Sequence, residues 1–220
     1  MDKIIELPTL TPLHAVLTGA ADEIGSACAR ALRNAGFELV VADIDKVPLA
    51  RLAHEIGAHA IPCDVLAEFS VQELVRETRA LFPSVDLLIN AAGSSYVRTL
   101  GMMRVSRAFT EAAEGRWLTV VNLAAATRGK PEPFGYAGSK QAFRRLSDGL
   151  GAALLPQGVH VMAVEDIDAP EDAAARVLQL CRGVGTLSDS KVRRIGRREP
   201  ACDEAEACRL LPNALFQSHV

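Results

Sequence analysis

A tyrosine and a lysine four residues apart carry the clearest chemistry in this sequence. Tyr136 and Lys140 lie in the run Phe-Gly-Tyr-Ala-Gly-Ser-Lys at 134–140, which is predicted to be helical. Four residues of helix bring two side chains onto one face, so a phenol and an ammonium would lie side by side. A free phenol holds its proton until about pH 10, and a nearby cation lowers that pKa. The pair is therefore a candidate for acid–base catalysis near neutral pH.

The chain around this pair alternates between short apolar runs and amphipathic stretches. Buried strands are predicted at 14–18, 38–42, 59–62, 85–89, 117–123 and 159–164. Each is followed by a predicted helix, at 24–34, 47–56, 70–82, 101–114, 135–155 and 171–181. This alternation predicts an α/β protein with a parallel sheet that helices cover on both faces. We expect one domain over 1–183. From a loop at 183–190 onward, we expect a tail (184–220) that forms an edge strand and short helix or an arm for oligomer contacts.

Composition limits the class of protein. The chain has 220 residues, 49% of them hydrophobic, and a net charge of -3, which favours a folded domain without general affinity for nucleic acid. Its apolar runs are too short to cross a membrane, and its first residues do not resemble a signal peptide. The five cysteines are scattered and odd in number, and the five histidines are dispersed. We therefore expect reduced thiols in the cytoplasm and no metal site.

Polar and glycine-rich segments follow the first four predicted strands. The first strand runs into Thr-Gly-Ala-Ala-Asp-Glu-Ile-Gly at 18–25, a turn that can aim backbone N–H groups and a helix N-terminus at a pyrophosphate. Asp43 ends the second strand; its carboxylate can bind adenosine ribose hydroxyls and repel a 2′-phosphate, which favours NAD over NADP. Asp64 follows the third strand. Asn-Ala-Ala-Gly at 90–93 follows the fourth, where small residues admit a nucleotide.

Together with Val-Asn at 121–122 and the Tyr-Ala-Gly-Ser-Lys run, this ordered set resembles the short-chain dehydrogenase/reductase family over residues 12–183. The resemblance implies a Rossmann-like, doubly wound fold and NAD(P)-dependent oxidation or reduction of an alcohol or carbonyl. Tyr136 would be the acid or base, and Lys140 would bind the nicotinamide ribose. In this family the two helices that correspond to 101–114 and 135–155 commonly build dimers or tetramers, so the resemblance implies a homo-oligomer or hetero-oligomer through them. The implied cofactor-binding residues are Thr18, Gly19, Ile24, Asp43, Asp64, Val65, Asn90, Ala91, Gly93 and Lys140.

Several positions depart from the family's pattern. Glu23 replaces the middle glycine of the turn and adds bulk and negative charge near a diphosphate, or else caps the helix with its neighbour. Ala124 or Ala125 stands where the family has a substrate-orienting serine, although Thr127 could supply a hydroxyl. One alignment puts Arg98 in place of the family's relay asparagine, where it would bind an anion or lie at the surface. An acidic segment at 165–168 replaces the usual Pro-Gly and substrate loop, and we expect it to be a solvated loop and helix cap.

These departures leave other functions open. A non-catalytic member would keep the sheet as a scaffold and act as a partner subunit in an oligomer. A redox-neutral dehydratase or cyclase would use Tyr136 and Lys140 without a hydride carrier. The basic run at 191–198 lacks interleaved aromatic residues, so we expect a surface or subunit contact there rather than a nucleic-acid site.

Overall fold

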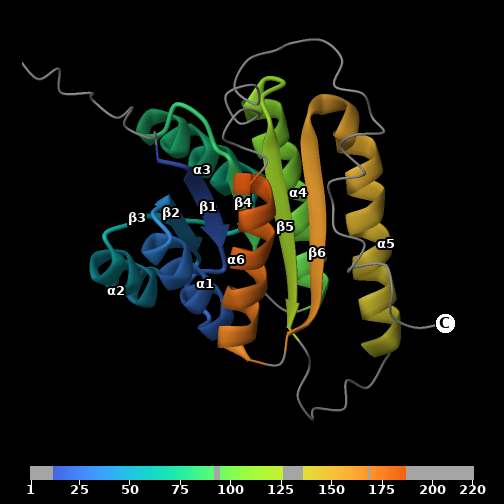
Figure 1. Ribbon diagram of the computed structural model, residues 1–220, viewed down its shortest axis with the longest axis horizontal. Helices are drawn as coiled ribbons and strands as arrows, with labels where there is room; N and C mark the ends of the chain where they lie inside the picture. The colour runs from blue at the N-terminus through green and yellow to red at the C-terminus, as the bar shows by residue number, and fades with distance from the viewer. Residues whose placement is uncertain (1–11, 92–94, 126–135, 168, 187–220) are drawn as a thin grey trace, which may run out of the picture.

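A six-stranded parallel sheet forms the centre of the molecule (Figure 1). The computed structural model describes residues 12–91, 95–125, 136–167 and 169–186, including their side chains except at 95–98, 125, 136–142, 166 and 182–186. The strand order is β3-β2-β1-β4-β5-β6, with every neighbouring pair parallel. The predicted α/β class is confirmed. The strands are β1 (His14–Thr18), β2 (Glu38–Asp43), β3 (His59–Pro62), β4 (Leu87–Asn90), β5 (Leu118–Ala125) and β6 (Val159–Ile167).

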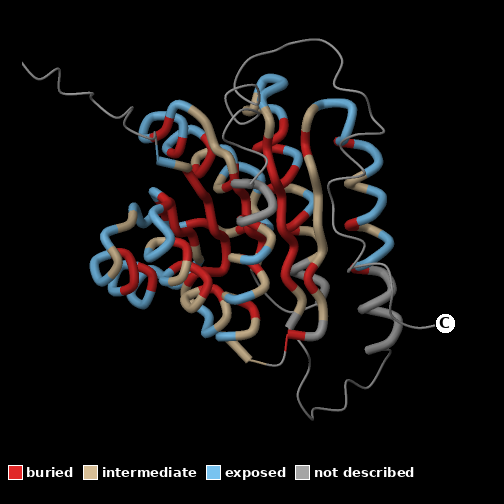
Figure 2. The backbone as a smooth tube through the Cα atoms, viewed as in Figure 1, coloured by how far each residue is buried: buried red, intermediate tan, exposed pale blue. Residues whose placement is uncertain are grey.

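Helices cover both faces of this sheet. One face carries α1 (Glu23–Asn34), α2 (Lys46–Ile56) and α6 (Pro170–Thr186). The other carries α3 (Glu68–Leu81), α4 (Ser95–Ala113) and α5 (Tyr136–Leu154), and the 3-10 turn η1 (Leu155–Gln157) follows α5. Successive strand residues supply the two apolar layers, with Leu17 and Val41 in one and Val16 and Val40 in the other. Figure 2 shows the buried residues along the strands and the inner sides of the helices.

The order of the strands determines where a ligand can bind. The chain builds β1, β2 and β3 outward in one direction and then returns to place β4 on the other side of β1. Ligands of such sheets bind at the carboxyl ends of the strands beside this reversal. In Figure 1 the first turn of α5 lies at the same edge as the ends of β5 and β6, so the topology brings the predicted catalytic helix to the ligand-binding edge.

The observed boundaries correct three expectations. β6 continues to Ile167, because the ladder to β5 passes an irregularity after Leu123 and resumes where Ala125 pairs with Ile167. The acidic segment expected as a loop after 164 therefore begins inside a strand. α6 continues to Thr186, so the prediction of a loop at 183–190 is wrong for its first four residues, which are helical. The rest of the tail, the basic run included, lies outside the described residues. None of the described helices is long and apolar enough to span a bilayer.

Candidate active site

The turn between β1 and α1 is closed so tightly that it requires glycine at two positions. Gly19 has φ +74°, in the left-handed region that glycine adopts without strain. A Cβ on Gly25 would lie 2.0 Å from the carbonyl oxygen of Gly19. The first turn of α1 therefore rests directly on the glycine loop. Ile24, in the first turn of α1, is partly buried and packs against the core.

Asp43 holds this turn from the neighbouring strand. Its Oδ2 accepts a hydrogen bond from the backbone N–H of Ala21 at 2.9 Å, and its Oδ1 accepts one from the N–H of Asp45 at 3.0 Å. The backbone N–H of Ala20 donates to the carbonyl of Ala42 at 3.2 Å. The residue predicted to select the cofactor thus also joins the end of β2 to the glycine turn after β1, a role that the sequence did not indicate.

Glu23 lies at the first position of α1, and its side chain is exposed. Asp22 occupies the N-cap position in an extended conformation, but its side chain makes no capping hydrogen bond, so the predicted cap is not formed in that way. A carboxylate in the first turn still interacts favourably with the helix dipole. Because the Glu23 side chain points to solvent, it does not fill the turn.

Asp64 and Val65 form the loop after β3. Asp64 Oδ1 accepts a hydrogen bond from the N–H of Leu66 at 2.9 Å, and its own N–H donates to Ser70 Oγ at 3.0 Å. Val65 is buried against α4, where a Cβ on Gly101 would come within 2.5 Å of Val65 Cγ2. The loop predicted to border the nucleotide is therefore fixed by local hydrogen bonds and by close packing on α4.

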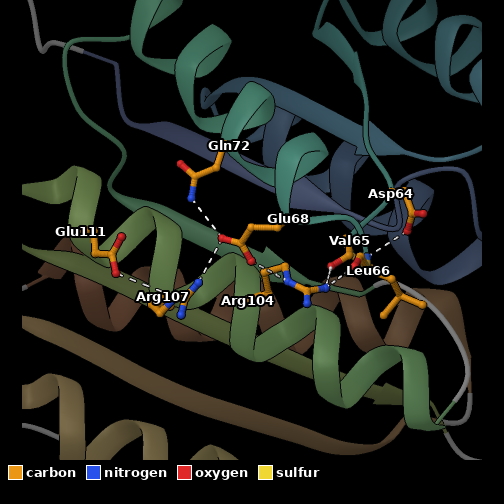
Figure 3. Close-up of polar contacts among 8 residues, drawn as sticks. All are labelled: Asp64, Val65, Leu66, Glu68, Gln72, Arg104, Arg107 and Glu111. Atoms are coloured by element: carbon orange, nitrogen blue, oxygen red, sulfur yellow. Dashed lines mark hydrogen bonds and ion pairs between the residues drawn. The ribbon is translucent and has the colours of Figure 1, made fainter.

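An ion-pair network holds α3 and α4 together beside this loop (Figure 3). Glu68 accepts hydrogen bonds from Arg104 at 2.8 Å and Arg107 at 3.0 Å, and Arg104 also donates to the backbone carbonyl of Leu66. Hydrogen bonds from Gln72 and the two arginines lower the pKa of Glu68. The sequence analysis missed this network, because its members come from two helices whose contact depends on the fold.

The side chains of Thr18 and Asn90 lie inside the protein, in a buried polar chain. Asn90 Nδ2 donates to Asn122 Oδ1 at 2.9 Å and to Ser106 Oγ at 3.1 Å, and Thr18 Oγ1 donates to Asn90 Oδ1 at 3.4 Å. Asn122 Nδ2 in turn donates to Ser147 Oγ on α5 at 3.3 Å. These two predicted cofactor residues thus join the central strands to α4 and α5. The strand register explains the first link of this buried polar chain, since Asn90 and Asn122 are directly paired in neighbouring strands.

Two further predicted cofactor residues follow β4. Ala91 is half-buried, and its backbone N–H donates to the carbonyl of Thr18 at 3.0 Å, which joins the ends of β1 and β4. Gly93 lies outside the described residues. Arg98 lies in the first turns of α4, but its side chain is outside the description.

Tyr136 and Lys140 occupy the first two turns of α5, as the sequence predicted. Their backbone positions are one helical turn apart, and their side chains are outside the description. Ala124 and Ala125 form the last two positions of β5, so no hydroxyl stands at the serine position within that strand. Thr127, the alternative hydroxyl, lies outside the described residues.

Glu165 lies in β6 with most of its side chain covered, which corrects its expected place in a solvated loop. Its side chain is only 9% exposed, and its Oε2 accepts a hydrogen bond from Nη2 of Arg144 at 2.6 Å. Its backbone carbonyl accepts one from Arg176 on α6 at 2.8 Å. Side-chain placements of Asp166 and Asp168 lie outside the description. The sequence analysis missed Arg144, because only the packing of α5 on β6 brings it to Glu165.

Comparison with known proteins agrees with this geometry. The sequence profile of the short-chain dehydrogenase family matches residues 13–166. A sorbitol dehydrogenase from Cereibacter sphaeroides is 33% identical over 175 residues, covering 68% of each chain. Two solved structures, each 24% identical, share the fold. NAD+-bound xylitol dehydrogenase has a TM-score of 0.60 over 70% of this chain and 69% of its own. A metagenomic short-chain oxidoreductase in complex with NADP has a TM-score of 0.65 over 78% of this chain and 91% of its own.

The profile match spans well over half of the chain, and it includes the glycine turn, Asp43, Asp64 and the helix of Tyr136 and Lys140. The structural neighbours share the same sheet and were solved with NAD+ or NADP. The fold, the order of the motifs and the sequence match agree. This chain therefore belongs to the short-chain dehydrogenase family of oxidoreductases.

Proposed function

We propose that this chain transfers a hydride between NAD and an alcohol or carbonyl substrate, with Tyr136 as the acid or base and Lys140 assisting. One observation carries the proposal: α5 starts at Tyr136 and places it and Lys140 one turn apart at the carboxyl edge of the sheet. Figure 1 shows the end of β1, where the glycine turn begins, at the same side of the sheet. An acid–base pair and a dinucleotide turn on one edge are the two parts that hydride transfer requires.

The described residues fit a dinucleotide. Gly19 gives the turn its left-handed backbone, Gly25 lets the first turn of α1 lie directly on it, and Glu23 is exposed to solvent. The Asp43 carboxylate uses two of its roughly four acceptor positions on backbone N–H groups, which leaves capacity for ribose hydroxyls. Its charge opposes a 2′-phosphate, so we propose NAD rather than NADP. Thr18 and Asn90 would act by shaping the groove, because their side chains are buried.

The chemical step follows from the proposed pair. When bound, NAD supplies or accepts the hydride. In reduction, the phenol of Tyr136 donates its proton to the oxygen that becomes the alcohol; in oxidation, the phenolate removes the proton from the alcohol. The ammonium of Lys140 favours the phenolate and would bind the nicotinamide ribose. With alanine at 124 and 125, a donor to the substrate oxygen is lost, and we expect turnover to be slower by on the order of 100-fold.

Titration with NADH and NADPH, followed by calorimetry and by thermal melting, tests the proposal directly. A dinucleotide at about 100 times its dissociation constant stabilises the folded state by about 2.7 kcal/mol. We expect NADH to raise the melting temperature more than NADPH at equal concentration. No shift with either at millimolar concentration would refute NAD-dependent chemistry at this site.

Turnover assays with Tyr136→Phe separate the remaining functions, with Tyr96→Phe as the control because it removes the only other tyrosine. Loss of NADH-dependent turnover in Tyr136→Phe alone supports the dehydrogenase. Dinucleotide binding without turnover, in the original protein and in Tyr136→Phe alike, supports the non-catalytic scaffold, which the alanines at 124 and 125 favour. Turnover that needs no dinucleotide and is lost in Tyr136→Phe supports a redox-neutral dehydratase or cyclase.

The assembly and location of the protein belong to the same proposal. We propose a homo- or hetero-oligomer through helices 101–114 and 135–155, supported by Met103 on α4, an exposed apolar side chain. Met103→Glu should lower the mass measured by analytical ultracentrifugation if this surface is the interface. A cytoplasmic location is supported by the free, buried thiols of Cys28, Cys63 and Cys181.

A further inference from the structure

The loop of residues 64–67 lies beside Asp43 at the carboxyl edge of the sheet. Asp43 pairs with Pro62 of the neighbouring strand, and the backbone N–H of Cys63 donates to the carbonyl of Asp43 at 2.9 Å. Asp43 is the residue proposed to bind the adenosine ribose. A dinucleotide bound in that way would lie with its adenosine half against this loop, so the shape of the loop should affect its affinity.

Hydrogen bonds within the loop fix its N–H groups and leave two of its carbonyls to another element. The N–H groups of Leu66 and Ala67 both donate to Asp64, at 2.9 Å to its Oδ1 and at 3.0 Å to its carbonyl oxygen. The carbonyls of Val65 and Leu66 accept instead from Nη1 of Arg104, which lies 3.4 Å from the oxygen of Val65. These bonds join the loop to α4 over 39 and 38 residues of sequence.

Glu68 holds the other side of the Arg104 guanidinium (Figure 3). Its Oε2 accepts from Nε of Arg104 at 2.8 Å, and the arginine side chain is only 29% exposed. Its Oε1 accepts from Gln72 at 3.3 Å and from Arg107 at 3.0 Å. A planar guanidinium carries its donors in a rigid fork, so the bond to Glu68 also fixes the direction of the bonds to the loop.

The second contact of the loop with α4 is apolar. Val65 is buried, and a Cβ on Gly101 would lie 2.5 Å from its Cγ2. Gly101 lies about one helical turn before Arg104, so both residues meet the loop from one side of α4. Apolar packing determines how closely the loop approaches the helix but is not directional. The orientation of the peptide groups after Val65 and Leu66 therefore depends on Arg104.

We propose that Arg104 is a positioning residue for the dinucleotide, which acts by fixing the loop of residues 64–67 through the carbonyls of Val65 and Leu66. The inference rests on the proposed function, in which Asp43 and this loop border the cofactor. Arg104 does not touch the cofactor, because its donors are directed at the loop and at Glu68. A loop that is ordered before binding raises affinity, since a ligand that must order the loop itself loses part of its binding free energy.

Arg107 supplies a matched control within the same network. It lies on the same helix and binds the same carboxylate, but its contacts are with Glu68 and Glu111 rather than with the loop. Arg104→Met and Arg107→Met each remove one positive charge and one ion pair with Glu68, and each keeps an unbranched side chain on α4. Equal effects are expected if these arginines only join the helices or attract an anionic ligand. An effect of Arg104→Met alone is expected if the loop contact matters.

Two measurements on the full chain test the proposal, and circular dichroism confirms that each variant is folded. In calorimetric titration with NADH, we expect Arg104→Met to raise the dissociation constant about tenfold, the effect of ordering roughly one backbone residue on binding, and Arg107→Met to change it by less than about twofold. In hydrogen exchange without ligand, followed by mass spectrometry, we expect faster exchange at Leu66 and Ala67 in Arg104→Met only.

A second matched pair covers a failure of Arg104→Met to fold. Arg104→Lys and Arg107→Lys keep the charge, but a lysine ammonium lacks the planar fork that bonds the loop and Glu68 together. We expect a loss of NADH affinity of roughly threefold in Arg104→Lys, and none in Arg107→Lys.

The outcomes that would overturn the inference differ from those that refute the proposed function. Equal losses of affinity in the variants of Arg104 and Arg107, or unchanged affinity in folded variants of Arg104, show that Arg104 does not position the dinucleotide. Faster exchange of the loop with unchanged affinity leads to the same conclusion. In all three cases the original protein still binds NADH, so the proposed function stands. If the original protein itself fails to bind NADH, both the function and this inference fall.

Discussion

The carboxylate of Asp43 accepts a hydrogen bond from the backbone N–H of Ala21 at 2.9 Å, so the end of β2 holds the turn that follows β1. A sheet position that faces the proposed adenosine ribose therefore also sets the shape of the proposed pyrophosphate site. Changes at Asp43 should affect both stability and the choice of cofactor.

Asp43→Asn tests this double role. The asparagine oxygen can still accept from Ala21, but its NH2 group cannot accept from Asp45, so we expect a loss of about 1 kcal/mol in the free energy of unfolding. Removal of the negative charge should also improve NADPH binding relative to NADH by about tenfold. Urea denaturation and calorimetric titration measure the two effects. An unchanged ratio of the two affinities would show that Asp43 does not face the 2′ position.

Gly25→Ala should be strongly destabilising. Its Cβ would lie 2.0 Å from the carbonyl oxygen of Gly19, a backbone atom that cannot move without opening the turn. We expect a loss of about 3 kcal/mol in the free energy of unfolding, together with weaker dinucleotide binding. The matched control is Gly149→Ala in α5, where a Cβ meets no atom within 4 Å. There we expect a gain of about 0.5 to 1 kcal/mol, because alanine favours a helix interior over glycine. Equal effects at both positions would contradict the packing of the turn.

The buried polar chain should be more costly to break at its centre than at its end. Asn122→Ala removes partners from both Asn90 and Ser147, and we expect a loss of about 2 to 3 kcal/mol. Ser147→Ala removes one long hydrogen bond, for which we expect about 1 kcal/mol. Chemical denaturation of both single variants and the double variant gives the coupling between them. Additive losses would show that Asn122 and Ser147 act independently.

Asp86, which directly precedes β4 at the amino end of that strand, should make the stability of the protein depend on pH. Burial raises the pKa of this carboxyl above its ordinary value of 3.8, although a backbone hydrogen bond from His14 and the charge of His14 lower it in part. Because the folded state holds the proton more tightly than the unfolded state, the contribution of Asp86 to stability falls as pH rises from about 3.8 through its folded pKa. Asp86→Asn should remove that decline.

The comparison is made by denaturation over this pH range, with Asp148→Asn as the control, because Asp148 is exposed on α5. We expect Asp86→Asn to gain stability relative to the original protein as the pH is raised to 7, and Asp148→Asn to follow the original curve. A gain that grows as the pH falls would reverse the sign and contradict a raised pKa for Asp86.

Much of the fold follows from local sequence patterns. β1 and β3 begin and end where the apolar runs predict, because each run is bounded by residues that break a strand. The helix of Tyr136 and Lys140, the turn at Gly19 and the place of Asp43 at the end of β2 were also predicted from residue type and spacing. These features depend on side-chain periodicity and on the special backbone freedom of glycine, both of which are readable within a few residues.

The partners of these residues were decided by the tertiary structure. The sequence indicated Asp43 but not its hydrogen-bond partner Ala21, and Asn90 but not its partner Ser106. It predicted a solvated loop at Glu165, which instead lies in a strand and pairs with Arg144. Each contact joins residues from 16 to 22 positions apart and exists only because the strand order and helix packing bring their elements together. Local periodicity determines which face of an element is buried, whereas strand order and register determine what that face meets. The sequence by itself therefore determined the family and the proposed catalytic pair, and the tertiary structure decided which side chains of the surrounding elements contact one another.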